Sequence, residues 1–141
     1  MDVVELSRFR KAVERGGEPF MRRIFTKREE VYARARRQTT LLHLAGRFAA
    51  KEAVIKAISQ IDPKRVPAMN QVEIRNDRLG RPHIILHDRG GHPADRFRRA
   101  GSPRKSRGRR PRGNGPSRPI QVHISLSHVN SVAIASAIAI R

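Results

Sequence analysis

The 141-residue sequence contains no cysteine. Without cysteine, neither a disulfide framework nor a thiolate metal site can form, and this composition fits a reducing compartment. The sequence also lacks any run of 18 or more apolar residues, which argues against a membrane-spanning helix. The chain reaches Asp2 and Glu5 before any apolar block, so no secretory signal peptide is visible. We therefore expect a soluble, cytoplasmic protein without a membrane span.

Acidic residues are scarce, with 12 Asp and Glu against 31 Lys and Arg and a formal net charge of +19. Such an excess indicates an anionic partner, which could be nucleic acid, a phosphate compound or an acidic protein. Residues 88–119 hold eleven Lys and Arg against two Asp, so nearly half of the excess lies in one segment. The remainder of the chain is still basic, and the charge therefore needs two separate explanations.

Aromatic residues are few, and segment 88–119 has only Phe97 among its Gly, Pro, Ser and Arg residues. It cannot bury enough apolar area to offset its ordering entropy, so we expect a disordered insertion in a single domain spanning 1–141. Its arginines would attract nucleic acid non-specifically through phosphates, but it lacks interleaved aromatic side chains on which bases stack. A basic nucleic-acid- or ribosome-associated protein remains one alternative function.

The stretch 41–58 predicts a long helix at the centre of the fold. Wound at about 100° per residue, four large apolar side chains form one stripe, and small residues cover most of the remaining surface. A helix that is apolar or small almost all round is typically buried. The large residues of the stripe are Leu41, Leu44, Phe48 and Ile55.

Four charged residues interrupt this apolar helix. Glu52 projects from the edge of the stripe, where a carboxylate is costly unless a cation or a hydrogen-bond donor meets it. Lys56 lies one turn further on, and Arg47 and Lys51 form a second pair with the same spacing on a neighbouring face. An ordinary ion pair between Glu52 and Lys56, contributing about 0.2–0.5 kcal/mol, is the structural alternative to a functional site.

Elsewhere, short apolar segments, some of them alternating with polar or small residues, predict five short strands. The last strand is bulky on one face and alanine-rich on the other, which suits a central strand with a helix lying close on the alanine side. Two of the others form a hairpin. The predicted strands are 2–4, 72–75, 83–86, 120–128 and 132–140.

Two basic helices are expected before the central one. The first starts at Ser7 as its N-cap and is stopped by Gly16-Gly17. The second opens with a capping box, Thr26 at the N-cap and Glu29 three residues later, and runs to about Gln38. The predicted fold class is α+β, with a small, largely antiparallel sheet packed on the long central helix and short basic helices outside.

The central helix carries the string Arg47-Phe-Ala-Ala-Lys-Glu-Ala-x-x-Lys-Ala57. This string resembles the signature helix of the phosphopantetheinyl transferases, specifically the short holo-acyl-carrier-protein synthase type. Two weaker motifs flank this helix in the order that the family has them. Asp2-x-x-x-x-x-Arg8 comes before it, and His123-Ile-Ser-Leu-Ser-His128 comes after it. The resemblance covers about residues 2–86 and 120–141 and leaves the basic insertion outside.

The resemblance implies an Mg²⁺-dependent transferase of fatty acid biosynthesis. Such an enzyme moves the 4′-phosphopantetheine arm of coenzyme A to a serine of apo-acyl carrier protein and releases adenosine 3′,5′-bisphosphate. By resemblance, Asp2 and Glu52 bind Mg²⁺, with diphosphate oxygens and water completing the octahedron. Lys56 would contact a phosphate or, with Glu52, help a water to accept the serine proton, and the identity of the base stays open.

The resemblance also implies coenzyme contacts and protein partners. Arg47 and Lys51 are candidates for binding the 3′-phosphate or the diphosphate, and His123 matches a histidine near the coenzyme. Acyl carrier proteins are acidic, so a basic helix beside the site would steer and orient them. A homotrimer with the coenzyme cleft between neighbouring protomers is implied as well. The basic face of the first helix comprises Arg8, Lys11 and Arg15.

The first motif departs from the family pattern. In the family, a short apolar strand with a glycine precedes the aspartate, whereas Asp2 directly follows Met1 in this sequence. A ligand beside a free terminus is poorly held unless neighbours tie it down, and a metal site depends on such support. An impaired transferase with a weakened metal site is therefore the second alternative.

Overall fold

The computed structural model describes residues 1–87 and 119–141. The predictions of a disordered insertion at 88–119 and of its attraction to nucleic acid concern residues outside the described ones, except for Pro119. In the described ranges the helices are α1 (Leu6–Ile24), α2 (Lys27–Arg34) and α3 (Thr40–Ile61), with short 3₁₀ turns at Arg37–Thr39, Pro63–Arg65 and Met69–Gln71. The strands are β1 (Asp2–Glu5), β2 (Val72–Asn76), β3 (Pro82–Leu86), β4 (Gln121–His128) and β5 (Val132–Ile140).

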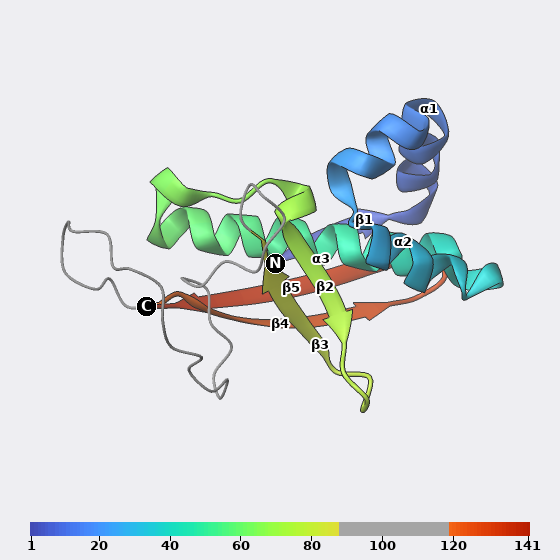
Figure 1. Cartoon of the computed structure of the whole chain (residues 1–141). Coiled ribbons are helices and arrows are strands. Elements are labelled where there is room, and N and C mark those ends of the chain that lie inside the picture. The colour runs from blue at the N-terminus through green and yellow to red at the C-terminus, as the bar shows by residue number, and fades with distance from the viewer. Residues whose placement is uncertain (88–118) are drawn as a thin grey trace.

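These strands form two small antiparallel sheets, one in the order β1-β5-β4 and one made of the β2-β3 hairpin. In the larger sheet, Ala135 of β5 pairs with Asp2 on one side and with Leu126 on the other. In the hairpin, Val72 pairs with Leu86. Helix α3 lies along β5, and α1 and α2 lie outside it (Figure 1). The predicted α+β class, the hairpin and the central position of the last strand are confirmed.

Helix α3 packs on β5 through small side chains. Ala133 and Ala135 of β5 are fully buried, and the small residues of α3 are buried with them. The large residues predicted to form the buried stripe are less covered, since Leu44 is buried but Phe48 and Ile55 are only partly so. Alanine side chains let the helix axis approach the strand, and this close approach covers the small face more completely than the large one.

Helix α1 differs from its prediction. It has Glu5 at the N-cap rather than Ser7, and Gly17 breaks it with a positive φ of 55°, which favours glycine. The chain then resumes a helical path, with Pro19 inside it, and continues to Ile24. Proline is tolerated in the first turn of a helical segment, so the glycine pair kinks the helix without ending it.

Helix α2 begins as predicted and ends earlier. The Thr26 backbone N–H donates to Glu29 Oε2 at 2.8 Å, and the Glu29 N–H donates to Thr26 Oγ1 at 3.4 Å, which confirms the capping box. The helix ends at Arg34 and a 3₁₀ turn leads into α3. No helix within residues 1–87 and 119–141 is long and apolar enough to cross a membrane.

Candidate functional site

Two residues predicted to be functional, Lys56 on α3 and Asp2 on β1, are in contact, and a third, Glu52, lies near Lys56. The Lys56 ammonium donates to Asp2 Oδ1 at 3.0 Å, with the lysine side chain 58% exposed and the aspartate side chain 18% exposed. Glu52 lies half-buried one turn before Lys56 on the same helix. The hydrogen bond and the charge of Asp2, together with the charge of Glu52, raise the pKa of Lys56. Lys56 therefore stays positively charged at neutral pH.

The sheet holds Asp2 in place. Its backbone pairs with Ala135 in the β1-β5 register, and the Leu6 N–H donates to the Ser131 carbonyl oxygen at 2.9 Å just beyond the strand. The condition set by the sequence, that neighbours must tie this residue down, is therefore met by β5.

The carboxylates of this cluster fit one kind of metal ion. Mg²⁺ is usually held by one or two carboxylates together with substrate phosphates and water. In the described part of the chain, no three His, Asp or Glu side chains lie close enough together to hold a metal ion on their own. Asp2 and Glu52 therefore suit a hard cation that shares its coordination with a phosphate substrate, and they do not suit a closed structural site.

Lys51 lies in the core, which contradicts the prediction that it binds the coenzyme. Its side chain is 0% exposed, and its ammonium donates to Glu29 Oε2 at 2.7 Å and to the carbonyl oxygens of Ile24 at 2.6 Å and Met69 at 3.1 Å. A lysine ammonium has three donors, so none is left for a phosphate. Burial lowers the pKa of Lys51, and the Glu29 carboxylate opposes that shift.

Glu29 is the residue whose wider role the sequence did not reveal. Besides capping α2 and pairing with Lys51, its carboxylate accepts a hydrogen bond from the Ile74 N–H at 2.9 Å. This one side chain therefore joins α2, α3 and β2. The Thr-x-x-Glu spacing predicts only the start of a helix. Nothing in the neighbouring sequence indicates the contacts with Lys51 and with the Ile74 N–H.

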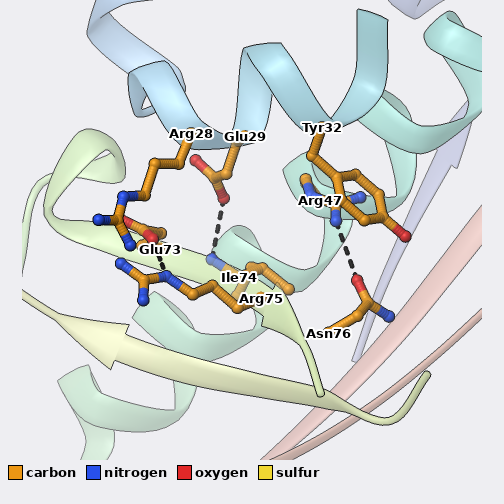
Figure 2. A pocket seen from close by; sticks show the side chains of 8 residues that line it. All are labelled: Arg28, Glu29, Tyr32, Arg47, Glu73, Ile74, Arg75 and Asn76. Carbon is orange, nitrogen blue, oxygen red and sulfur yellow. Dashed lines mark hydrogen bonds and ion pairs between the residues drawn. The ribbon is translucent and has the colours of Figure 1, made fainter. Parts of the chain in front are cut away.

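Arg47 lies on a different side of α3, beside a pocket of about 190 Å³ (Figure 2). Its guanidinium lies 4.0 Å from the centre of the Tyr32 ring and donates to Asn76 Oδ1 at 3.0 Å and to the His43 carbonyl oxygen at 3.3 Å. Burial lowers the pKa of Arg47, yet this group remains charged at neutral pH. The pocket is lined by Arg28, Glu29, Tyr32, Arg47, Glu73, Ile74, Arg75 and Asn76.

Arg47 and Glu52 do not point to the same place. They are five residues apart on α3, which corresponds to about 140° around the helix axis. Arg47 is fixed to Asn76 at the end of β2, whereas Lys56, on the Glu52 side, reaches Asp2 on β1. One chain therefore presents two separate groups, a carboxylate-lysine cluster and an arginine pocket.

The two histidines of the last motif also separate. His123 is exposed in the middle of β4, opposite Ile138 of β5. His128, at the end of β4, contacts His43 with ring centroids 5.8 Å apart, and His43 contacts Tyr32 at 5.8 Å. The structure therefore joins His128 to the surroundings of Arg47, whereas the role predicted for His123 stays a prediction.

The basic face of α1 is solvent-exposed as predicted. All three of its residues are exposed, and in the described part of the chain none of them forms a salt bridge. Their charges are therefore available to an acidic partner. These residues are Arg8, Lys11 and Arg15.

The fold is that of a small α+β protein, and comparison with known proteins shows which family it belongs to. The family model of the 4′-phosphopantetheinyl transferase superfamily matches residues 1–132, so the chain belongs to this superfamily. The family predicted from the motifs is confirmed.

Two relatives illustrate the similarity within this superfamily. A holo-[acyl-carrier-protein] synthase of Ruminiclostridium cellulolyticum is 31% identical over 137 residues, covering 97% of this chain and 87% of the relative. The enzyme of the same name from Protochlamydia amoebophila is 41% identical over 85 residues, covering 60% of this chain and 68% of the relative.

Solved structures of such enzymes have the same fold. The synthase of Bacillus anthracis, in complex with CoA (3′,5′-ADP), is 26% identical with a TM-score of 0.62, covering 98% of this chain and 90% of that chain. The synthase-CoA complex of Chronobacterium ammoniagenes is 25% identical with a TM-score of 0.68, covering 98% of this chain and 92% of that chain.

Proposed function

We propose that this chain transfers the 4′-phosphopantetheine arm of coenzyme A to a serine of apo-acyl carrier protein, as a holo-acyl-carrier-protein synthase that depends on Mg²⁺. The observation that carries the proposal is the meeting of Asp2, Lys56 and Glu52 at the edge of α3. It is supported by the superfamily match and by relatives and solved structures named as holo-acyl-carrier-protein synthases, two of them in complexes with coenzyme A. A cytoplasmic location stays a prediction.

The charges of the cluster suit attack on a diphosphate. The serine oxygen forms a bond to the β-phosphorus while the bond from that phosphorus to the bridging oxygen breaks, and adenosine 3′,5′-bisphosphate leaves. Mg²⁺ held by Asp2 and Glu52 would neutralise charge on the diphosphate when bound. The Lys56 ammonium donates to a phosphate oxygen and stabilises negative charge there.

The serine proton needs an acceptor. Lys56 is a poor candidate, because its pKa is raised by Asp2 and Glu52 and its ammonium is already protonated at neutral pH. The sequence leaves Lys56 and Glu52 as candidates for the base, so Glu52 remains, and it would act directly or through a water. We assign it the role of base.

The separation of Arg47 from Glu52 favours a coenzyme site shared between protomers. On the outer face of the larger sheet, β1 and β5 expose four apolar side chains, since Val3 is 55%, Ile134 42%, Ile138 64% and Ile140 52% exposed. We propose that a homotrimer covers these side chains and that the arginine pocket of one protomer and the cluster of the next form one coenzyme site. Light scattering should then give the mass of three chains, and Ile138→Lys should give single chains with little transfer activity. A fully active single chain would contradict the trimer.

The predicted coenzyme contacts can be tested by measuring KM for coenzyme A in variants of Arg47 and of the two histidines on β4, His123 and His128. His128 lies beside the Arg47 pocket through His43, while His123 lies exposed on the sheet face. If Arg47 binds coenzyme phosphates in this pocket, Arg47→Met and His128→Ala should both raise KM for coenzyme A. His123→Ala raises the same KM only if the sequence-based role of His123 is correct.

The acidic carrier is proposed to dock on the basic face of α1. Exposed charges across an interface mainly set the association rate and its salt dependence. Replacing Arg8, Lys11 and Arg15 by Glu should therefore raise KM for the carrier and leave KM for coenzyme A unchanged. An unchanged carrier KM would place the docking surface elsewhere.

The direct test of the reaction is the mass of the carrier. The chain is incubated with coenzyme A, MgCl₂ and apo-acyl carrier protein, and we expect the carrier to gain the mass of one phosphopantetheine, with no gain when EDTA is added. A carrier that stays unmodified, while the Ruminiclostridium cellulolyticum synthase modifies the same preparation, would overturn the proposal.

A further inference from the structure

The carboxylate of Asp2 already has a cation beside it. Lys56 Nζ lies 3.0 Å from Asp2 Oδ1, close enough for a charge-assisted hydrogen bond. The two partners differ in mobility, since the Asp2 side chain is 18% exposed on a paired strand and the Lys56 side chain is 58% exposed on a flexible stem. The carboxylate is therefore fixed, and the ammonium is free to move.

A divalent ion and this ammonium compete for the same group. Mg²⁺ coordinates carboxylate oxygens at about 2.0–2.1 Å, so an ion bound to Asp2 would lie within a few ångströms of the Lys56 nitrogen where that nitrogen now stands. Two cations at such a distance repel each other strongly. Binding of the ion to Asp2 therefore requires the ammonium to move away.

A diphosphate offers the ammonium another partner. Its oxygens carry concentrated negative charge and would lie beside the same metal ion. Lys56 is exposed and long enough to exchange one anionic acceptor for another without unfolding any part of α3. When the coenzyme is present, the new contact between the Lys56 ammonium and the diphosphate offsets the free energy lost on leaving Asp2. When the ion binds alone, no such contact forms and the loss is not offset.

We propose that Lys56 is a placeholder cation on Asp2, which weakens binding of the divalent ion alone and makes the ion and coenzyme A bind cooperatively. The inference rests on the proposed function, because it takes Asp2 and Glu52 as the metal ligands and a diphosphate as the substrate. Linkage requires the effect to be reciprocal, so the ion must tighten coenzyme binding by the same factor as the coenzyme tightens ion binding.

The test measures binding and not turnover. Mn²⁺ serves as the spectroscopic probe, and electron paramagnetic resonance of free Mn²⁺ gives its Kd for the full-length protein with and without coenzyme A, corrected for Mn²⁺ held by the coenzyme in solution. In the wild type, we expect coenzyme A to tighten Mn²⁺ binding by about fivefold or more, the lower end of common coupling factors. In Lys56→Met, we expect Mn²⁺ alone to bind about fivefold or more tighter than in the wild type, and the tightening by coenzyme A to shrink.

The matched control is Lys64→Met. Lys64 is exposed on the 3₁₀ turn after α3, so this variant removes the same unit of charge away from Asp2. It should bind Mn²⁺ as the wild type does. Equal tightening in Lys64→Met and Lys56→Met would show an effect of net charge alone, and no tightening in Lys56→Met would show that Lys56 does not compete. Either result overturns the inference.

Two further variants, Glu52→Gln and Asp2→Asn, separate this inference from the proposed function. Glu52→Gln should weaken Mn²⁺ binding with coenzyme A present, and thermal melting checks that each variant is folded. If Glu52→Gln and Asp2→Asn both bind Mn²⁺ as the wild type does, the proposed metal site itself is wrong. If they lose Mn²⁺ while Lys56→Met binds it no tighter, the metal site stands and only the placeholder role fails.

Discussion

Lys51 and Lys56 lie on the same helix, and each pairs with a carboxylate from a distant part of the chain. Lys51 meets Glu29 at 2.7 Å with side chains 0% and 1% exposed, whereas Lys56 meets Asp2 at 3.0 Å with side chains 58% and 18% exposed. Three protein acceptors saturate the buried ammonium, whereas within residues 1–87 and 119–141 the exposed one donates to Asp2 alone and can leave it. Two ion pairs of the same chemical type therefore differ in role because they differ in burial.

The largest expected effect breaks the buried pair. Lys51→Met leaves Glu29 buried without its cation, and breaking a buried ion pair by removing one partner typically costs about 3–5 kcal/mol. We expect urea denaturation to show a loss of this size in the free energy of unfolding. Lys64→Met, which removes an exposed charge, should change that free energy by about 0.5 kcal/mol or less.

The pairing itself is tested in a second background. When Glu29 is already Gln, Lys51→Met should cost clearly less than it does in the wild type, since no charge is then left unpaired. An equal cost in both backgrounds, or a Lys51→Met variant as stable as Lys64→Met, would contradict the structural role assigned to this pair.

The exposed pair of Lys56 and Asp2 leads to a prediction about the dependence of transfer on Mg²⁺ concentration. Asp2→Asn should raise the Mg²⁺ concentration for half-maximal transfer by about tenfold or more, since even outer-shell partners of metal sites contribute that much. Its thermal stability should change little, because an ion pair with an exposed lysine contributes little to stability. An unchanged Mg²⁺ titration would remove Asp2 from the metal site.

His43, a third position on α3, predicts a smaller effect, on the pH dependence of stability. Burial, followed by the charges of Arg36, Arg47 and His128, lowers the pKa of His43. The unfolded chain then binds a proton before the folded chain does, so stability falls as the pH drops below about 6.5, the ordinary pKa of histidine.

His43→Phe removes this proton and keeps an aromatic ring beside Tyr32 and His128. Its melting temperature should therefore fall less than that of the wild type between about pH 7.5 and pH 5.5. Parallel losses in the two proteins would show that His43 does not contribute to acid sensitivity.

Much of the fold could be predicted from local patterns. The alternation of side chains between the two faces of a strand predicts strands such as β2 and β4. The apolar residues on both faces of β5 predict its central position. The second half of α1 was missed, since Gly16-Gly17 and Pro19 are typical of a helix end, and only the packing of Met21 and Ile24 shows that the helix continues.

The site was predicted less completely than the fold. The meeting of Asp2, Glu52 and Lys56 follows from motifs in separate segments, because β1 pairs with the strand on which α3 packs. The spacing on α3 suggested that Lys51 pairs with Arg47 in function, whereas its true partner, Glu29, lies on another helix. Helical spacing shows which residues share a face of α3, but the burial of that face depends on contacts with distant segments.

The most direct measurement of the central claim is the rate of phosphopantetheine transfer by Glu52→Gln, followed by carrier mass, together with its melting temperature. Transfer should fall about a hundredfold or more, the usual contribution of a positioned general base. The melting temperature should stay close to the wild-type value, because the attraction between Glu52 and Lys56, four residues apart on α3, contributes only about 0.2–0.5 kcal/mol. Transfer at the wild-type rate would show that this carboxylate belongs to the scaffold and would contradict the account.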